Sequence, residues 1–252
     1  MTKRLLGAGC VLALGLLVPA FAEDDKKGKD DKPNPAAKNL NRDVARHKEF
    51  LKRIEKSKGK GDVIFLGDSI THGWEGHKKI WDEYFGEFHP VNLGIGGDQT
   101  GHILWRITEG KELEHLNPKA AVIMIGTNNT GGHSAEQIAG GIKAIVEELK
   151  KQKPHMKILV LGVFPRGNRG DADKETKTIP ADKLNKKIPA INAIISKLAD
   201  GKTVFYKDIG KDFLTPEGGL SAAIMPDYLH LSAKGYAIWG KAIKGDLEKL
   251  VK

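Results

Sequence analysis

The 252-residue sequence predicts an α/β fold in which a five-stranded parallel sheet carries helices on both faces. Three observations support this prediction. Five short apolar runs alternate along the chain with segments of helical periodicity. Most of these runs are continuously apolar, as in strands that are covered on both faces. Glycine-rich and polar segments follow several of the runs, where loops at strand ends are expected.

The first 22 residues have the pattern of a secretory signal peptide. Two basic residues precede an apolar run over residues 5–18, and Ala20 and Ala22 are small residues at the positions that a signal peptidase reads. The run is shorter than a transmembrane helix requires. We therefore expect cleavage after Ala22, a secreted or periplasmic protein, and no stable membrane insertion. Cys10, the only cysteine, leaves lipoprotein processing as an alternative.

Residues 23–38 are rich in charges of both signs and lack large apolar side chains, which predicts a disordered charged linker. Residues 39–252 are long enough for one globular domain with a large core. That domain is expected to open with an amphipathic helix over residues 39–56, because apolar residues recur there at roughly helical spacing.

Five apolar runs are predicted to form the strands, at residues 62–67, 90–93, 120–125, 157–163 and 203–206. A helix should begin after Ser134, because Gln137 completes a capping box, and should end before Pro154. A final helix should begin near Ser232. Residues 167–183, which are polar and charged, are predicted to form a long surface loop near the end of the fourth strand.

The net charge of +9 does not by itself indicate a partner. The lysines are scattered along the chain and no nucleic-acid-binding motif is present, so we expect a basic surface and no nucleic-acid partner. The sequence leaves the oligomeric state open.

Four segments that follow predicted strands, or precede the last helix, carry residues suited to chemistry. They are residues 67–73, 94–100, 126–129 and 227–230. Sites in open parallel sheets form at the carboxyl ends of the strands. The four loops are therefore expected to bring a serine, backbone amides, a carboxamide and an Asp–His pair to one edge.

This set of groups meets the needs of acyl transfer. Ser69 would be the nucleophile, His230 its base, and Asp227 the carboxylate that orients the imidazole ring. An oxyanion would be bound by the backbone N–H groups of Ser69 and Gly97 and by the Asn128 side chain.

Each of these features alone has a more ordinary explanation. Gly67-Asp68-Ser69 and Gly96-Gly97 occur in many turns, Asn128 could cap a segment, and an Asp–His pair is often structural. Nor do the glycines at 94–97 match the dinucleotide-binding fingerprint. Only their joint occurrence, in order and at strand ends, points to an enzyme.

The ordered set Gly67-Asp68-Ser69, Gly97, Gly126-Thr127-Asn128 and Asp227-x-x-His230 resembles the four blocks of the SGNH/GDSL hydrolases. The stretches VNLGIGGDQTGHILWR, IGTNN and LGVFPRG resemble most closely the catalytic subunits of platelet-activating-factor acetylhydrolase type Ib. The resemblance covers about residues 60–251. It implies a three-layer flavodoxin-like fold, no metal or organic cofactor, and the catalytic and oxyanion residues named above.

The sequence is less specific about the substrate. The resemblance favours short-chain, acetyl esters, whereas the secretory signal and the lack of an apolar lid favour acetylated carbohydrate over lipid. A platelet-activating-factor-like lipid and a non-catalytic carbohydrate-binding module remain alternatives. Trp74 and Trp105 lie close in sequence to site loops and are candidates for substrate binding, although core packing is the commoner role of tryptophan.

Overall fold

The computed structural model describes Met1 and residues 33–252. The chain divides into two units, and the second of them, Pro33–Lys252, is the domain described below. The predicted signal peptide and most of the predicted linker therefore lie outside the described residues. Within residues 33–252, no helix is both long and apolar enough to span a membrane.

The domain is built on one five-stranded parallel sheet with the strand order β2-β1-β3-β4-β6. This confirms the predicted fold class, and the order is that of flavodoxin-like sheets. The central strands β1 and β3 are buried along their whole length, which explains their continuously apolar sequences. The strands span β1 (Val63–Gly67), β2 (Pro90–Gly94), β3 (Ala120–Met124), β4 (Lys157–Leu161) and β6 (Val204–Lys207).

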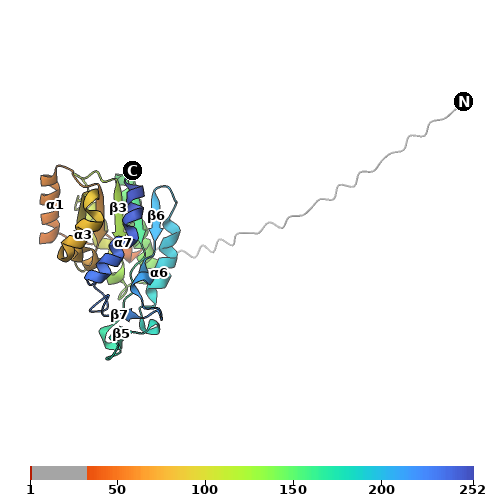
Figure 1. Cartoon of the computed structure of the whole chain (residues 1–252). Coiled ribbons are helices and arrows are strands. Elements are labelled where there is room, and N and C mark those ends of the chain that lie inside the picture. The colour runs from red at the N-terminus through yellow and green to blue at the C-terminus, as the bar shows by residue number, and fades with distance from the viewer. Residues whose placement is uncertain (2–32) are drawn as a thin grey trace. The chain divides into compact units, whose positions relative to one another are not determined.

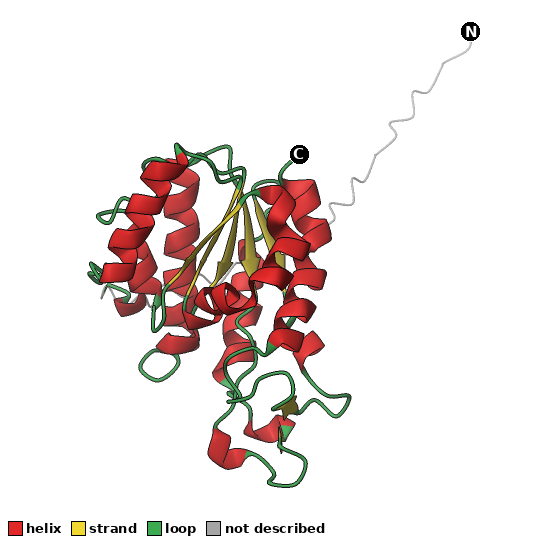
Figure 2. Ribbon diagram, turned by 60° about the vertical axis from the view of Figure 1, so that its left-hand side comes forward, coloured by secondary structure: helices red, strands yellow, loops and turns green. Residues whose placement is uncertain are grey.

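Helices cover both faces of the sheet, as Figure 2 shows. Side chains alternate along β1, so that Ile64 and Leu66 enter one core while Val63 and Phe65 enter the other. The first core is closed by α1 (Ala45–Ser57), α4 (Thr100–Ile107), α5 (Ala135–Gln152) and α6 (Lys187–Ile195). The second is closed by α3 (Lys78–Phe85) and α7 (Ala233–Leu250), and a short helix α2 (Ser69–His72) follows β1.

Two helix starts occur where the sequence predicts them. The Ser134 hydroxyl accepts a hydrogen bond from the backbone N–H of Gln137, and the Gln137 side-chain oxygen accepts one from the backbone N–H of Ser134, so the predicted capping box is confirmed. Ser232 caps α7 in the same position. Short 3-10 segments occupy Pro35–Ala37, Gly73–His77, Gly86–Phe88, Thr127–Asn129, Arg169–Asp171, Ala181–Lys183, Ser196–Leu198 and Gly210–Phe213.

The start of the domain differs from the expectation. Residues 33–38, assigned to the linker, pack against the domain: Ala36 is buried and its carbonyl accepts a hydrogen bond from Thr100. The chain then stays extended to Val44, so the first helix begins six residues later than expected. Leu40 contacts Gly101 instead of joining a helical stripe.

The segment 167–183 is more than a surface loop. It contributes β5 (Thr178–Ile179), which pairs antiparallel with β7 (Leu220–Ser221). Ile179 and Leu220 are opposite each other in this pair, and both are fully buried in the second core, which supplies packing that the polar composition of the segment concealed. Because one segment follows β4 and the other follows β6, the small sheet forms a lobe beyond one end of the main sheet (Figure 1).

Candidate active site

Ser69 lies at the turn between β1 and α2. Asp68 caps α2 by accepting a hydrogen bond from the N–H of Ile70 at 2.9 Å, so Ser69 is the first helical residue. Gly67 is required before this turn, because a Cβ there would lie 2.0 Å from the Thr71 hydroxyl. The serine is thus fixed where β1 emerges from the core.

Asp227, His230 and Ser69 form one chain of hydrogen bonds. His230 Nε2 lies 2.9 Å from Ser69 Oγ, and its Nδ1 lies 2.7 Å from Asp227 Oδ2. The side chains of His230 and Asp227 are 43% and 36% exposed, so this chain of bonds opens to solvent. The three residues predicted to act together are therefore brought together by the fold.

The Asp227 carboxylate also shapes the loop that carries His230. Its Oδ1 atom accepts hydrogen bonds from the N–H groups of Leu229 at 3.1 Å and His230 at 2.7 Å. Burial acts to raise the pKa of Asp227, but the hydrogen bonds from His230 and the backbone outweigh it and lower that pKa. Tyr228, inside the turn, has a φ of 62°, a conformation that is costly for a residue other than glycine.

Two backbone donors converge near Ser69. Within the described chain, the N–H groups of Ser69 and Gly97 have no hydrogen-bond acceptor. Gly97 has a φ of 79°, which glycine adopts without strain. The Asn128 side chain donates to the carbonyl of Asp98 at 2.9 Å and lies 3.5 Å from the carboxylate of Asp68. All three predicted oxyanion donors thus lie in loops at the carboxyl ends of β1, β2 and β3.

A buried cluster of charges holds the Gly97 loop. Arg42 donates to Asp98 Oδ1 at 2.8 Å and to the carbonyl of Gly96 at 2.6 Å. Arg106 Nε lies 3.0 Å from the other oxygen of Asp98, and its Nη1 lies 2.7 Å from Glu112. Asp98, Arg106 and Glu112 are fully buried, and His47 bonds Glu112 at 2.8 Å.

Two carboxyl groups of the site have raised pKa values. Asp68 is fully buried, and desolvation raises its pKa to about 7. Burial likewise raises the pKa of Asp98 to about 6, against the opposing effect of Arg106 and Arg42. Neither effect is evident in the sequence, where Asp68 is one letter of a common tripeptide.

The two tryptophans proposed for substrate binding belong to the core. Trp74 is 1% exposed and packs against Tyr236 with ring centroids 4.6 Å apart. Trp105 is 9% exposed and stacks edge-on against His47. Trp74, in the 3-10 segment Gly73–His77, belongs to the second core and also lines the cavity along β2, and Trp105 lies on the buried α4, so core packing accounts for both positions.

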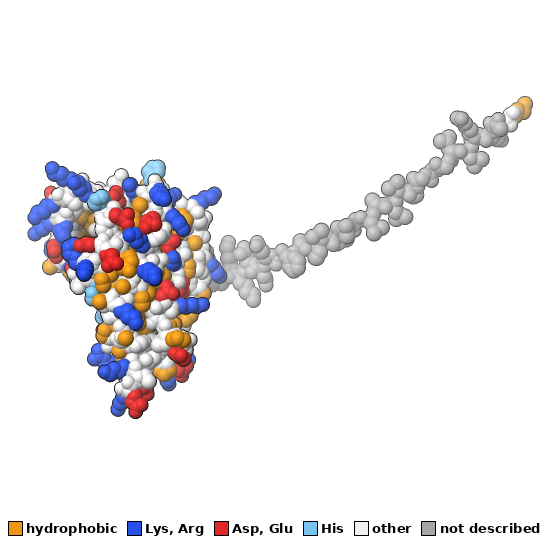
Figure 3. Space-filling model, viewed as in Figure 1, with side chains coloured by type: hydrophobic (Ala, Val, Ile, Leu, Met, Phe, Trp, Pro, Cys, Tyr) orange, Lys and Arg blue, Asp and Glu red, His pale blue; other side chains and the backbone are white. Residues whose placement is uncertain are grey.

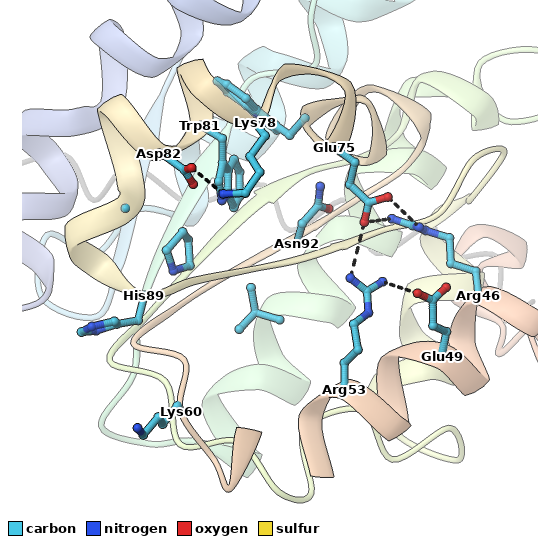
Figure 4. A pocket seen from close by; sticks show the side chains of 14 residues that line it. Arg46, Glu49, Arg53, Lys60, Glu75, Lys78, Trp81, Asp82, His89 and Asn92 are labelled. Atoms are coloured by element: carbon cyan, nitrogen blue, oxygen red, sulfur yellow. Dashed lines mark hydrogen bonds and ion pairs between the residues drawn. The ribbon is translucent and has the colours of Figure 1, made fainter. Parts of the chain in front are cut away.

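Two cavities flank different parts of the domain. A cavity of about 690 Å³ lies along the edge strand β2, between α1 and α3, and contains none of the residues predicted to be catalytic. Figure 4 shows its ion pairs, which join Arg46 and Arg53 to Glu75 and Lys78 to Asp82. A second cavity of about 400 Å³ is lined by Asn128 and by residues that follow β4.

Sequence reasoning did not find the residues behind the oxyanion loop. Arg42 and His47 come from one part of the chain, Arg106 and Glu112 from another, and the two parts meet only in the fold. No motif links them. Charged residues at apolar positions of a helix, such as Arg106 in the otherwise apolar α4, are the one signal that could have indicated a buried pair.

Comparison with known proteins identifies the family of the chain. A family model described as the GDSL-like Lipase/Acylhydrolase family matches residues 65–238. The platelet-activating factor acetylhydrolase IB subunit alpha1 of Bos taurus is 38% identical over 191 residues, 75% of this chain and 76% of that protein. The alpha2 subunit of Rattus norvegicus is 37% identical over 195 residues, 77% of this chain and 78% of that protein.

A solved structure shares the fold. A GDSL-like lipase from Bacteroides thetaiotaomicron superposes with a TM-score of 0.61 at 22% identity, over 81% of this chain and 97% of that one. The likeness extends over nearly all of that structure.

Proposed function

The chain belongs to the GDSL-like lipase/acylhydrolase family and is an ester hydrolase, and we propose that it cleaves acetyl esters with Ser69 as the nucleophile. The observation that carries the proposal is the continuous pair of hydrogen bonds from Asp227 through His230 to Ser69. A serine hydroxyl is a weak nucleophile unless a base accepts its proton, and His230 Nε2 is within reach to do so.

In the first half of the reaction, Ser69 Oγ attacks the ester carbonyl carbon while its proton passes to His230 Nε2. The carbonyl oxygen becomes an oxyanion, which the free N–H groups of Ser69 and Gly97 would bind. Asn128 would join them by exchanging its bond to the Asp98 carbonyl for one to the oxyanion. The C–O bond then breaks, and His230 returns the proton to the leaving alcohol.

In the second half, water attacks the acyl-Ser69 ester and gives its proton to His230. The same donors bind the second oxyanion, and collapse of the intermediate returns the proton to Ser69 Oγ as the carboxylic acid leaves. The Asp227 carboxylate, whose pKa is lowered, stays ionised throughout and stabilises the imidazolium.

Labelling with a fluorophosphonate tests the proposal directly. The reagent forms a covalent bond only with an activated serine, so peptide mapping should find it on Ser69, and Ser69→Ala should abolish both labelling and hydrolysis of p-nitrophenyl acetate. A non-catalytic carbohydrate-binding module on the same fold would not be labelled. Absence of labelling in a folded protein would therefore refute the assignment.

For the substrate, we propose a small acetyl ester, with acetylated carbohydrate favoured. The cavity beside Asn128 supports this choice, because its lining side chains are polar or charged and it offers no apolar wall for an alkyl chain. The relatives named as platelet-activating factor acetylhydrolase subunits favour a lipid as the second candidate. Faster turnover of p-nitrophenyl octanoate than of the acetate would contradict the acetyl preference.

We also propose that the protein is exported, with residues 1–22 removed as a signal peptide and Glu23 at the mature N-terminus. Support comes from the basic start, the short apolar run and Ala20-Phe21-Ala22. N-terminal sequencing of the protein recovered from outside the cytoplasm tests this. A chain that begins with a lipid-modified Cys10 would establish the lipoprotein alternative instead.

A further inference from the structure

The cavity of about 400 Å³ lies against the site described above. Its walls come from the loop that follows β3 and from two parts of the segment between β4 and α6. The lining residues are Thr127, Asn128, Thr130, Gly131, Arg166, Gly167, Asn168, Lys183 and Asn185.

Two contacts connect this cavity to the reacting groups. Asn128, a proposed oxyanion donor, is itself part of the wall. On the other side, Gly167 donates its backbone N–H to the carbonyl of Tyr228 at 3.1 Å, within the turn that places His230. A group bound in the cavity would therefore lie beside Asn128 and beside the turn that carries His230. If that group is part of an ester substrate, its ester bond would be close to Ser69.

The lining carries positive charge and no negative charge. Arg166 and Lys183 line the cavity, whereas no aspartate or glutamate does so. Arg166 makes one weak hydrogen bond, to the hydroxyl of Thr127 at 3.4 Å, and within residues 33–252 neither cation forms an ion pair. Asn168 and Asn185 add carboxamide groups to the same walls.

The cavity along β2 provides the contrast. It is larger and also lined by cations, but its arginines and Lys78 are each paired with a glutamate or aspartate, as Figure 4 shows. Of its lysines and arginines, only Lys60 has no ion pair among the described residues. The charge of Arg166 and Lys183 is left for a ligand.

We propose that the cavity beside Asn128 is a subsite for an anionic group, a carboxylate or a phosphate, carried by the ester substrate close to its scissile bond. Guanidinium groups bind both of these anions through paired N–H donors, and a lysine adds a point charge. Cations in a concave site also raise the local concentration of an anionic substrate. The inference rests on the proposed function, since it assigns the substrate class of the Ser69 site.

Paired substrates provide the test. Wild-type protein is assayed on an acetylated hexuronic acid and on its neutral methyl ester, and on an acetylated hexose phosphate and the corresponding neutral hexoside. We expect kcat/KM to be about tenfold higher for the anionic member of at least one pair, mainly through KM, and the preference to shrink as salt screens the charges. The pair that shows the preference identifies the anion as a carboxylate or a phosphate.

Variants then locate the effect. Arg166→Gln and Lys183→Gln should each lower the ratio of kcat/KM for the anionic ester to that for its neutral partner, and Arg166→Lys should restore part of it. A general loss of activity cancels in this ratio. Lys78→Gln removes the same charge from the β2 cavity, where the cation is exposed and paired, and should leave the ratio and the activity at their wild-type values.

The outcomes separate this inference from the proposed function. If p-nitrophenyl acetate is hydrolysed in a Ser69-dependent way but neither anionic ester is preferred, the anionic subsite is refuted and the esterase proposal stands. A preference that persists unchanged in the double variant Arg166→Gln/Lys183→Gln would also refute the subsite. Absence of Ser69-dependent turnover of any ester would overturn the proposed function, and this inference with it.

Discussion

The loop that carries Asp227 and His230 and the loop that carries Gly97 serve the same serine but are held by different means. Hydrogen bonds among four consecutive residues shape the first loop, a single backbone bond from Gly167 to Tyr228 joins it to another segment, and the side chains of Asp227 and His230 are partly open to solvent. Side chains from distant parts of the chain fix the second, and they are charged and fully buried at Asp98, Arg106 and Glu112. The side of the site proposed to transfer protons is thus built largely from local contacts, and the side proposed to bind the oxyanion is built around buried charges.

This difference has a consequence for substitutions. Substitution of Asp227 or His230 should alter the rate of ester hydrolysis and leave the free energy of unfolding nearly unchanged, because these two side chains are partly exposed. Substitution of Asp98, Arg106 or Glu112 should mainly lower the free energy of unfolding. The fold places these two kinds of residue within one site, so rate and stability can be separated by experiment.

The largest expected effect is that of His230→Ala on the rate. Without the base, kcat on an acetyl ester should fall by roughly 10⁴- to 10⁶-fold, as for other residues that act as one unit with the nucleophile. The thermal midpoint should hardly change, since the ring is 43% exposed. His155→Ala, on an exposed histidine after α5, is the matched control and should leave kcat unchanged. Wild-type kcat in His230→Ala would end the assignment.

The second effect is on stability. Arg106→Met leaves Asp98 and Glu112 buried without their shared cation, which should lower the free energy of unfolding by about 3–5 kcal/mol. Asp227→Asn should lower it by no more than about 0.5 kcal/mol, because that side chain is 36% exposed. Urea denaturation measures both values.

If Arg106→Met does not fold, Glu112→Gln serves in its place. This variant keeps the shape of the side chain and weakens only one partner of Arg106, so a loss of about 1–3 kcal/mol is expected. Equal losses in Glu112→Gln and Asp227→Asn would mean that the two loops are not held differently.

The sequence could predict the features that depend on local contacts. The strands and the helices capped by Ser134 and Ser232 follow from local patterns, because continuous burial and capping leave their marks within a few residues. Asp227 and His230 could be paired for the same reason. Arg42 could not be assigned, since it meets Asp98 only after folding has brought separate segments together, and Arg106, although only one helix away from Asp98, belongs to no motif that indicates the pair.

The errors have a related cause. Residues 33–38 were expected to be disordered because their composition is poor in large apolar groups, yet the buried Ala36 and a hydrogen bond from Asn34 to the carbonyl of Gln137 anchor them. Trp74 and Trp105 lie near site loops in the sequence, but Trp74 packs in an aromatic cluster of the core and Trp105 lies on the buried α4. Closeness along the chain predicted the contact between Asp227 and His230 because the two residues share one turn.

A third prediction tests the oxyanion side itself. Asn128→Ala removes one donor and should lower kcat by roughly 10²- to 10³-fold with little change in KM. Asn129→Ala is the informative neighbour: that side chain is buried and bonds Thr100, so its loss should reduce the free energy of unfolding by about 1–3 kcal/mol. If Asn128→Ala reduced stability as much as Asn129→Ala and left kcat intact, Asn128 would be a structural residue.

The smallest expected effect is the pH dependence of the free energy of unfolding that arises from the burial of Asp68. Its pKa is about 7 in the folded protein and 3.8 for the unperturbed group, so between these values the folded state holds a proton that the unfolded state has lost. The stabilising contribution is therefore complete below about pH 4 and is lost as the pH rises through 7. Asp68→Asn removes this titration and keeps a side chain that can cap α2.

Urea denaturation at a series of pH values measures the contribution. From pH 4.5 to 7.5, the free energy of unfolding of the wild type should decline relative to that of Asp68→Asn by about 2 kcal/mol, less than the full shift implies because proteins relax around buried charges. Asp212→Asn, on an exposed carboxylate, should run parallel to the wild type. Parallel curves for the wild type and Asp68→Asn would show that Asp68 is solvated in solution. Asp68, beside Ser69, would then not be a buried carboxyl group like Asp98. The difference between the two loops would rest only on the buried charges of Asp98, Arg106 and Glu112.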